Sequence, residues 1–226
     1  FVSELHDTIR AIKPWVKFGI SPFGIYHNAT TSALPGSATK GLQNYDDLYA
    51  DVLYWVNQGW VDYIVPQLYW EIGHKTADYA TLIKWWSKYG SKRPLVIGQD
   101  VERTVRAADL EQPKINQQPA KFALQRSLPG VVGSCLWYSA VVVDNVGNYA
   151  TALRTNYHKY PALSPDYSFM YKKAPKKPKR LKALWMPDGY YLFWSTSSTN
   201  DEMNKATRYV IYRFEKGQER DLDNPA

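Results

Sequence analysis

The alternation of short apolar runs with longer amphipathic segments restricts the fold of this chain more than any other feature of its sequence. Four runs rich in β-branched and aromatic residues are predicted to be strands. They cover residues 16–21, 63–69, 95–99 and 131–138. A helical segment follows each run, and this order is typical of parallel strands joined by crossover helices. Because the runs are apolar at nearly every position, we expect strands that are covered on both faces.

The helical segments have recognisable beginnings and ends. The first stops before Pro14, the second stops at Gly59, and the third has Asp78 as its predicted cap and Gly90 as its end. The predicted helices cover residues 5–12, 45–58, 80–89, 119–127 and 147–160. Since eight strand-helix units close a (β/α)₈ barrel, the sequence predicts an α/β fold with half of such a barrel in residues 1–163.

A different composition begins near residue 161 and is typical of β-structure. Residues 164–179 form a basic linker that contains prolines, and strands are predicted at residues 180–185, 190–194 and 209–214. The turn sequence Pro187-Asp188-Gly189 joins the first two of these strands. The spacing suggests a fibronectin-type-III-like β-sandwich. About seven strands complete such a sandwich, so residues 180–226 are predicted to form only its first part.

The formal net charge of +7 would ordinarily indicate nucleic acid or an anionic membrane as a partner. Seven basic residues lie within residues 172–182, which contain no acid, so the rest of the chain is balanced. We interpret this stretch as a solvated linker, with a basic arm for an anionic polymer as the alternative. The aromatic residues lie elsewhere, among acids and amides, and we expect no nucleic-acid partner. No apolar run approaches the length of a membrane span.

Cysteine and histidine offer no alternative chemistry. Cys135 is the only cysteine, which excludes an internal disulfide, and its apolar surroundings predict a buried, inert thiol. The four histidines are scattered without metal-ligand spacing, so we expect neither a metal nor a cofactor. His74 is interpreted as a loop residue, with contact to a ligand as the alternative.

Aromatic and amide residues occur together at the carboxyl ends of the predicted strands, where a (β/α)₈ barrel builds its active site. Tryptophan and tyrosine rings stack on the C–H faces of sugars, and amides and hydroxyls bind sugar hydroxyl groups. Each ring alone fits the core as well as a ligand site, but the same pattern at four strand ends predicts sugar binding. The candidate residues are Ser21, Phe23, Tyr26, Gln67, Tyr69, Trp70, Gln99, Trp137 and Tyr138.

Glycoside hydrolysis ordinarily uses two carboxyl groups on either side of the scissile bond. Glu71 is the first catalytic candidate, because it directly follows two aromatic residues whose rings would favour its protonated, acid form. Asp100 is the second, although a helix-capping role fits it equally well. Asp62 lies at the opposite end of its strand and is interpreted as structural. Asp46 and Asp47 are interpreted as caps or dipole partners of the helix predicted to begin at residue 45.

Several of these motifs together resemble the bacterial glycosyl-hydrolase-like family 10, which includes hydrolases of peptidoglycan glycans. The similarity covers about residues 1–160. The matching motifs are KPW at 13–15, FGISPFGIY at 18–26, YD at 45–46 with the helix to Trp60, VDYIVPQLYW at 61–70, ADY at 77–79, WW at 85–86 and IGQ at 97–99.

The resemblance implies that the four strands are numbers five to eight of the barrel. It also implies a pair of catalytic aspartates at the end of the fourth strand, and nothing in this sequence matches that motif. The missing half is then supplied by another segment of the same protein or by a second copy of the chain. The implied activity is hydrolysis of bacterial cell-wall or related glycans in the cell envelope. A non-catalytic carbohydrate-binding module and a purely structural fragment are the alternatives.

Overall fold

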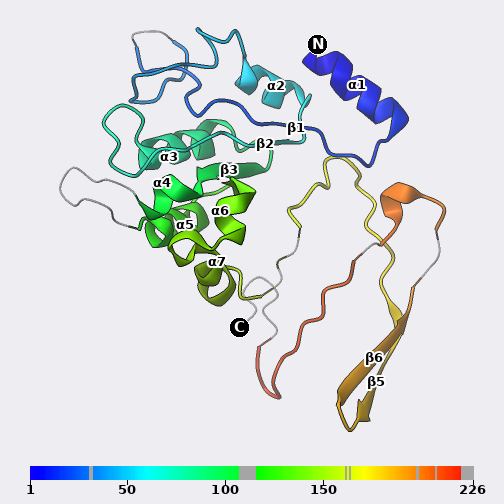
Figure 1. Cartoon of the computed structure of the whole chain (residues 1–226). Coiled ribbons are helices and arrows are strands. Elements are labelled where there is room, and N and C mark those ends of the chain that lie inside the picture. Colours follow the sequence, from blue (N-terminus) through cyan, green and yellow to red (C-terminus); the bar gives the residue numbers. More distant parts are fainter. Residues whose placement is uncertain are drawn as a thin grey trace. The chain divides into compact units, whose positions relative to one another are not determined.

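A computed structural model of the 226-residue chain divides into two units, Phe1–Asp166 and Tyr167–Ala226 (Figure 1). The structure describes residues 1–30, 33–106, 116–160, 162, 164–196, 199–206 and 208–219. The division falls close to residue 163, where the sequence analysis placed the end of the half-barrel.

Four parallel strands form the sheet of the first unit in the order β1-β2-β3-β4, as predicted. They are β1 (Gly19–Ile20), β2 (Tyr63–Ile64), β3 (Leu95–Asp100) and β4 (Val131–Trp137). The first two strands are shorter than predicted. Pro22 and Pro66 lie just beyond them and have no N–H to donate to a ladder, so pairing continues only as isolated bridges at Gln67.

Three of the helices lie close to their predicted positions. They are α1 (Val2–Ile12), α3 (Tyr79–Tyr89) and α5 (Gln118–Ser127). The cap predicted for the third helix is present, because an Asp78 carboxylate oxygen accepts the backbone N–H of Thr81 at 2.7 Å. Gly90 follows its last turn, also as predicted.

Helix α2 (Val52–Gln58) is shorter than predicted and does not begin at residue 45. Its cap is Asp51, whose carboxylate accepts the backbone N–H three residues later at 2.9 Å. The residues before it form turns, so the interpretation of Asp46 and Asp47 as helix caps is wrong. Asp47 instead accepts a loop N–H at 2.7 Å.

The end of the first unit is more broken than the predicted helix over residues 147–160. Gly147 (φ 57°) and Asn148 (φ 60°) have left-handed backbone conformations that interrupt a right-handed helix. Two short helices were not predicted. The additional and divided elements are α4 (Val101–Val105), α6 (Ser139–Val143), η1 (Val146–Asn148), α7 (Tyr149–Ala152) and η2 (Leu153–Tyr157).

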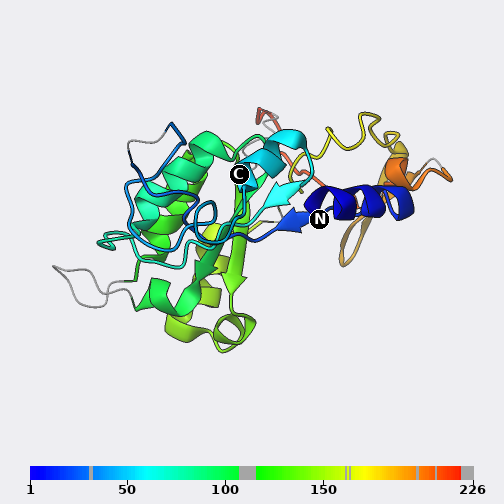
Figure 2. The same ribbon diagram turned by 90° about the horizontal axis from the view of Figure 1, so that it is seen from above.

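The two faces of the sheet are unequally covered. Ile64, Pro66 and Leu68 are buried, whereas the residues that alternate with them from Tyr63 to Tyr69 are only partly buried. Figure 2 shows helices beside one side of the strands, and α3 contacts β3 while α5 contacts β4. The opposite side, which we call the open face, carries Gln67 and the residues that pair with it across the sheet, Gly98 and Cys135. Within the described residues, the expectation that both faces are covered is therefore wrong.

Most of the core of the first unit lies between the covered face and the helices. Trp86 and Tyr79 on α3 are fully buried there, together with Ile64 and Ile97 on the strands. The indole Nε1 of Trp86 donates to the carbonyl of Gly24 at 2.8 Å, which fixes the loop after β1 to the helix. A smaller cluster, formed mainly by α4, α5, α6 and α7, packs around Tyr149. The buried core and the Trp86 hydrogen bond therefore anchor the loop after β1 to helix α3.

The second unit contains an antiparallel hairpin of β5 (Lys179–Met186) and β6 (Gly189–Ser195). The predicted turn at residues 187–189 joins its strands. The segment 209–214 forms no strand in the structure, so that prediction is wrong, because the segment has no ladder partner among the described residues. A short 3₁₀ helix, η3 (Glu202–Asn204), completes the regular elements described in this unit.

Candidate functional site

Stacked aromatic rings lie at the carboxyl end of the sheet. The ring centroids of Tyr69 and Trp137 are 6.3 Å apart at an interplanar angle of 22°, and Tyr138 packs on Trp137 at 5.9 Å. Trp137 is 55% exposed and Tyr138 is 45% exposed. Burial raises the pKa of the Tyr69 phenol, and the nearby Cys135 and Asp100 act in the same direction. Tyr69 therefore remains a neutral donor beside an accessible aromatic surface.

Polar groups lie on the open face below these rings. The amide nitrogen of Gln67 donates to the backbone carbonyl of Ser21 at 3.2 Å and to its hydroxyl oxygen at 3.3 Å. The Ser21 hydroxyl donates in turn to the carbonyl of Val65 at 2.9 Å. This chain of hydrogen bonds holds an amide and a hydroxyl at the ends of neighbouring strands, as the sugar-site prediction requires.

Phe23 and Trp70 form a second aromatic pair, with centroids 5.6 Å apart and rings nearly perpendicular. Gly24 makes this packing possible, because a Cβ atom there would lie 2.6 Å from the Trp70 ring and 2.5 Å from the Gln67 carbonyl. Both rings are only partly buried. The pair joins the loop after β1 to the loop after β2.

Glu71 lies in the loop after β2, and its side chain is partly buried. Its backbone carbonyl accepts the N–H groups of His74 and Tyr79, each at 3.3 Å. Its carboxylate accepts no hydrogen bond from the part of the chain that the structure describes. His74 closes the same loop, because its Nδ1 accepts the N–H of Ala77 at 3.1 Å, in agreement with the interpretation of His74 as a loop residue.

Asp100 ends β3 and caps α4. One carboxylate oxygen accepts the backbone N–H of Arg103 at 2.9 Å, and the other lies 3.7 Å from the Nε of the same arginine. The capping alternative weighed for this residue is thus present in the structure. β3 pairs Asp100 with Trp137 on β4, which places the carboxylate beside the exposed rings.

Lys121 on α5 is a fully buried cation beneath this site that the sequence analysis did not identify. Its Nζ donates to the carbonyl of Trp70 at 2.9 Å and to the hydroxyl of Thr104 at 3.0 Å, and lies 4.5 Å from the Tyr79 ring centroid. Burial lowers the pKa of Lys121 to about 8, against the opposing effect of Glu71 and Asp100. Lys121 follows Gln118 by three residues and precedes Gln125 by four, so the sequence places three polar residues on one face of this helix. That pattern was the available signal.

Two residues predicted to contact the substrate are buried, and these assignments are corrected. Tyr26 is 2% exposed, stacks on Trp85 at 5.4 Å and donates to Asp51 at 2.8 Å. Gln99 is fully buried on the covered face and donates to the Ser134 hydroxyl at 3.3 Å. Both lie near strand ends but point into the packing between the sheet and the helices.

Cys135 is exposed, so the prediction of a buried thiol is wrong. The pairing of Gly98 with Cys135, and of Gln67 with Gly98, places the cysteine in one row across the open face. The apolar run around Cys135 predicted its strand correctly but not the exposure of one side of that strand.

No group of three or more potential metal ligands occurs among the residues that the structure describes. Within the same residues, no helix is long and apolar enough to cross a membrane.

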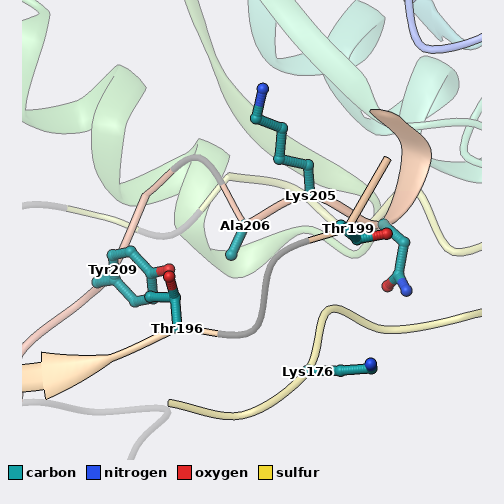
Figure 3. A pocket seen from close by; sticks show the side chains of 7 residues that line it. Lys176, Thr196, Thr199, Lys205, Ala206 and Tyr209 are labelled. Carbon is teal, nitrogen blue, oxygen red and sulfur yellow. The ribbon is translucent and has the colours of Figure 1, made fainter. Parts of the chain in front are cut away.

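Two cavities lie away from the strand ends. One of about 740 Å³ runs beside β4 and is lined by Val131–Ser134, Phe122 and Tyr157 among others. The other, of about 240 Å³, lies within the second unit (Figure 3) and is lined by Lys176, Thr196, Thr199, Asn204, Lys205, Ala206 and Tyr209. None of the predicted site residues lines either cavity. The strand-end rim therefore remains the candidate site.

Comparison with known proteins identifies the class to which this site belongs. Residues 1–117 match the family described as Glycosyl hydrolase-like 10, and the chain belongs to that family. This confirms the family resemblance inferred from the strand-end motifs.

Named relatives extend the similarity beyond the family match. The chain is 36% identical over 223 residues to Glycosyl hydrolase YngK of Bacillus subtilis (strain 168), covering 98% of this chain and 44% of that protein. It is 45% identical over 86 residues to Glycosyl hydrolase DigH of Escherichia coli (strain K12), covering 38% of this chain and 19% of that protein. The chain thus spans less than half the length of these relatives.

Proposed function

We propose that this chain supplies one half of a (β/α)₈ glycoside hydrolase that acts on bacterial cell-wall or related glycans. The observation that carries the proposal is the rim where the exposed rings of Trp137 and Tyr138 and the partly buried ring of Tyr69 lie beside Asp100. Aromatic faces next to amides and carboxylates suit a chain of sugars, which offers C–H faces and hydroxyl groups together. Membership of a glycosyl hydrolase-like family supports the same chemistry.

The uncovered sheet supports the half-barrel. In the described sheet β1 and β4 are edge strands, and the open face lacks the side-chain layers that fill a closed barrel. Residues of the edge strand β4 line the cavity of about 740 Å³, so no described strand covers this edge. Another segment of the same protein closes the barrel in this proposal. The match to less than half of YngK favours that source over a second copy of the chain.

In the proposed reaction Glu71 is the general acid that protonates the leaving-group oxygen. Its position directly after Trp70 places it in the loop after β2, and Asp100 ends the neighbouring strand β3. Hydrolysis needs a second carboxylate as nucleophile or base. Asp100 fills that role, or the segment that completes the barrel supplies it.

A non-catalytic carbohydrate-binding module is the second candidate function. The observation that favours it is the engagement of Asp100 as the cap of α4, which leaves Glu71 as the one candidate carboxylate that accepts no hydrogen bond from the described residues. In both cases we propose a location in the bacterial cell envelope, where the glycan occurs. We also propose that the hairpin of the second unit begins a fibronectin-type-III-like module.

Calorimetric titration of the chain with cell-wall oligosaccharides tests the glycan site. Alanine substitutions at Tyr69, Trp70, Trp137 and Tyr138 should each weaken binding about fivefold, because an aromatic contact contributes about 1 kcal/mol. Trp15→Ala is the matched control, since that tryptophan is 45% exposed and lies away from the rim. Unchanged affinity in all four variants would exclude the glycan site. Release of reducing ends distinguishes the enzyme from the binding module.

A further inference from the structure

Both backbone neighbours of Glu71 are held by side chains from one place, the start of α5. The carbonyl of Trp70 accepts the Lys121 ammonium at 2.9 Å. The Ile72 N–H donates to the side-chain oxygen of Gln117 at 2.7 Å, and the Ile72 carbonyl accepts the nitrogen of the same amide at 2.9 Å. Three side-chain hydrogen bonds therefore bracket a single residue, the one with the candidate carboxylate.

The same two residues are also tied to α4, the helix that Asp100 caps. Lys121 donates to the hydroxyl of Thr104 at 3.0 Å, and that hydroxyl donates to the carbonyl of Asp100 at 2.6 Å. The backbone N–H of Gln117 donates to the Thr104 carbonyl at 2.9 Å. The loop after β2 and helix α4, which follows β3, are thus joined through α5.

Burial gives these bonds more effect than surface hydrogen bonds have. Lys121 is fully buried, Thr104 is fully buried, and Gln117 is 7% exposed. An unmet buried carbonyl or amide is costly, so each partner holds the other in one geometry. A charged donor also makes a stronger bond than a neutral one. Burial of an apolar side chain at this part of α5 would cost less desolvation free energy than burial of a lysine or a glutamine. We therefore infer that the polar side chains do more than fill space.

We propose that Gln117 and Lys121 form a clamp that positions Glu71 relative to Asp100 at the rim of the sheet. Both side chains are buried and bind backbone groups beside Glu71, so we assign them as positioning residues. The consequence for catalysis rests on the proposed function, whereas the clamp itself does not. The two parts are therefore measured separately.

Amide hydrogen exchange of the chain tests the clamp without any glycan. Lys121→Met removes the donor to Trp70 but leaves the Gln117–Ile72 pair intact. If the two side chains act together, the Ile72 amide should exchange about tenfold faster in Lys121→Met, while the amide of buried Leu82 on α3 keeps its rate. Lys84→Met, at an exposed position of α3, is the control and should change neither amide.

An unchanged Ile72 rate, or an equal acceleration at Leu82, overturns the clamp. If Lys121→Met does not fold, Thr104→Val decides by the same criterion, because it keeps the volume and removes one acceptor of the ammonium. In a protein that carries this chain together with the proposed other half of the barrel, Lys121→Met should lower kcat about tenfold and leave KM unchanged, since only the position of Glu71 changes. Absence of turnover in the unsubstituted protein would refute the proposed hydrolase and leave the exchange result standing.

Discussion

The buried ammonium of Lys121 should make the stability of the chain depend on pH in a way that one substitution removes. Burial lowers its pKa from 10.5 to about 8. Between these values the unfolded chain binds a proton that the folded chain does not, so the free energy of unfolding rises as pH rises through this window. From about pH 7 to about pH 9.5 the rise from this group is about 2 kcal/mol.

Urea denaturation of the chain at both pH values, monitored by tryptophan fluorescence, measures this rise. Lys121→Met should lack it, and Lys84→Met should retain it, so the difference between the two variants isolates the buried group. The raised pKa of Tyr79 acts above about pH 10 and is present in both variants. Parallel profiles for the unsubstituted chain and Lys121→Met would refute the burial of a charged amine at this position.

Three further predictions concern the loops and the open face. Gly24→Ala should destabilise the chain by about 1–3 kcal/mol in urea denaturation, because its Cβ would lie 2.5 Å from the Gln67 carbonyl; an unchanged midpoint would contradict the packing of the two loops. Asp78→Ala should cost about 1 kcal/mol through loss of the α3 cap, with Asp144→Ala at an exposed position after α6 as the comparison; equal stability of the two variants would contradict the capping role. Cys135 should react with a thiol reagent at the rate of an accessible thiol in this chain, and much more slowly in a protein that also carries the proposed other half of the barrel; equal rates would contradict a barrel closed over the open face.

The parts of the fold that depend on local signals could be predicted from the sequence. Helix α3 begins after Asp78 and ends before Gly90, as expected, because a cap and a glycine stop act on adjacent residues. The helix before β2 was predicted too long. The spacing of apolar residues from Leu48 to Val56 fits a helix. Leu48, however, is 47% exposed and lies in a turn, so it does not belong to the buried helix face that the spacing predicted.

The side to which a strand residue points could not be predicted in the same way. Gln99 and Asp100 are neighbours at the end of β3, and side chains alternate between the faces of a sheet. An apolar strand gives no polar-apolar alternation from which to choose, so Gln99 was expected at the rim although it is buried beneath the sheet. Lys121 was missed because the spacing of polar residues on α5 marks one helix face but does not reveal the partner of the ammonium, a carbonyl 51 residues earlier.

Turnover of purified cell-wall glycan strands, by a protein that carries this chain together with the proposed other half of the barrel, tests the catalytic role of Glu71 most directly, with Glu71→Gln as the variant. General acid catalysis contributes about 10²–10⁴-fold, so release of reducing ends should fall by that factor while binding of the glycan persists. Gln43→Glu, in the loop before α2, controls for an acid-amide exchange away from the rim. A loss of only a few-fold in Glu71→Gln would contradict the catalytic role of Glu71 and leave the rim as a binding surface.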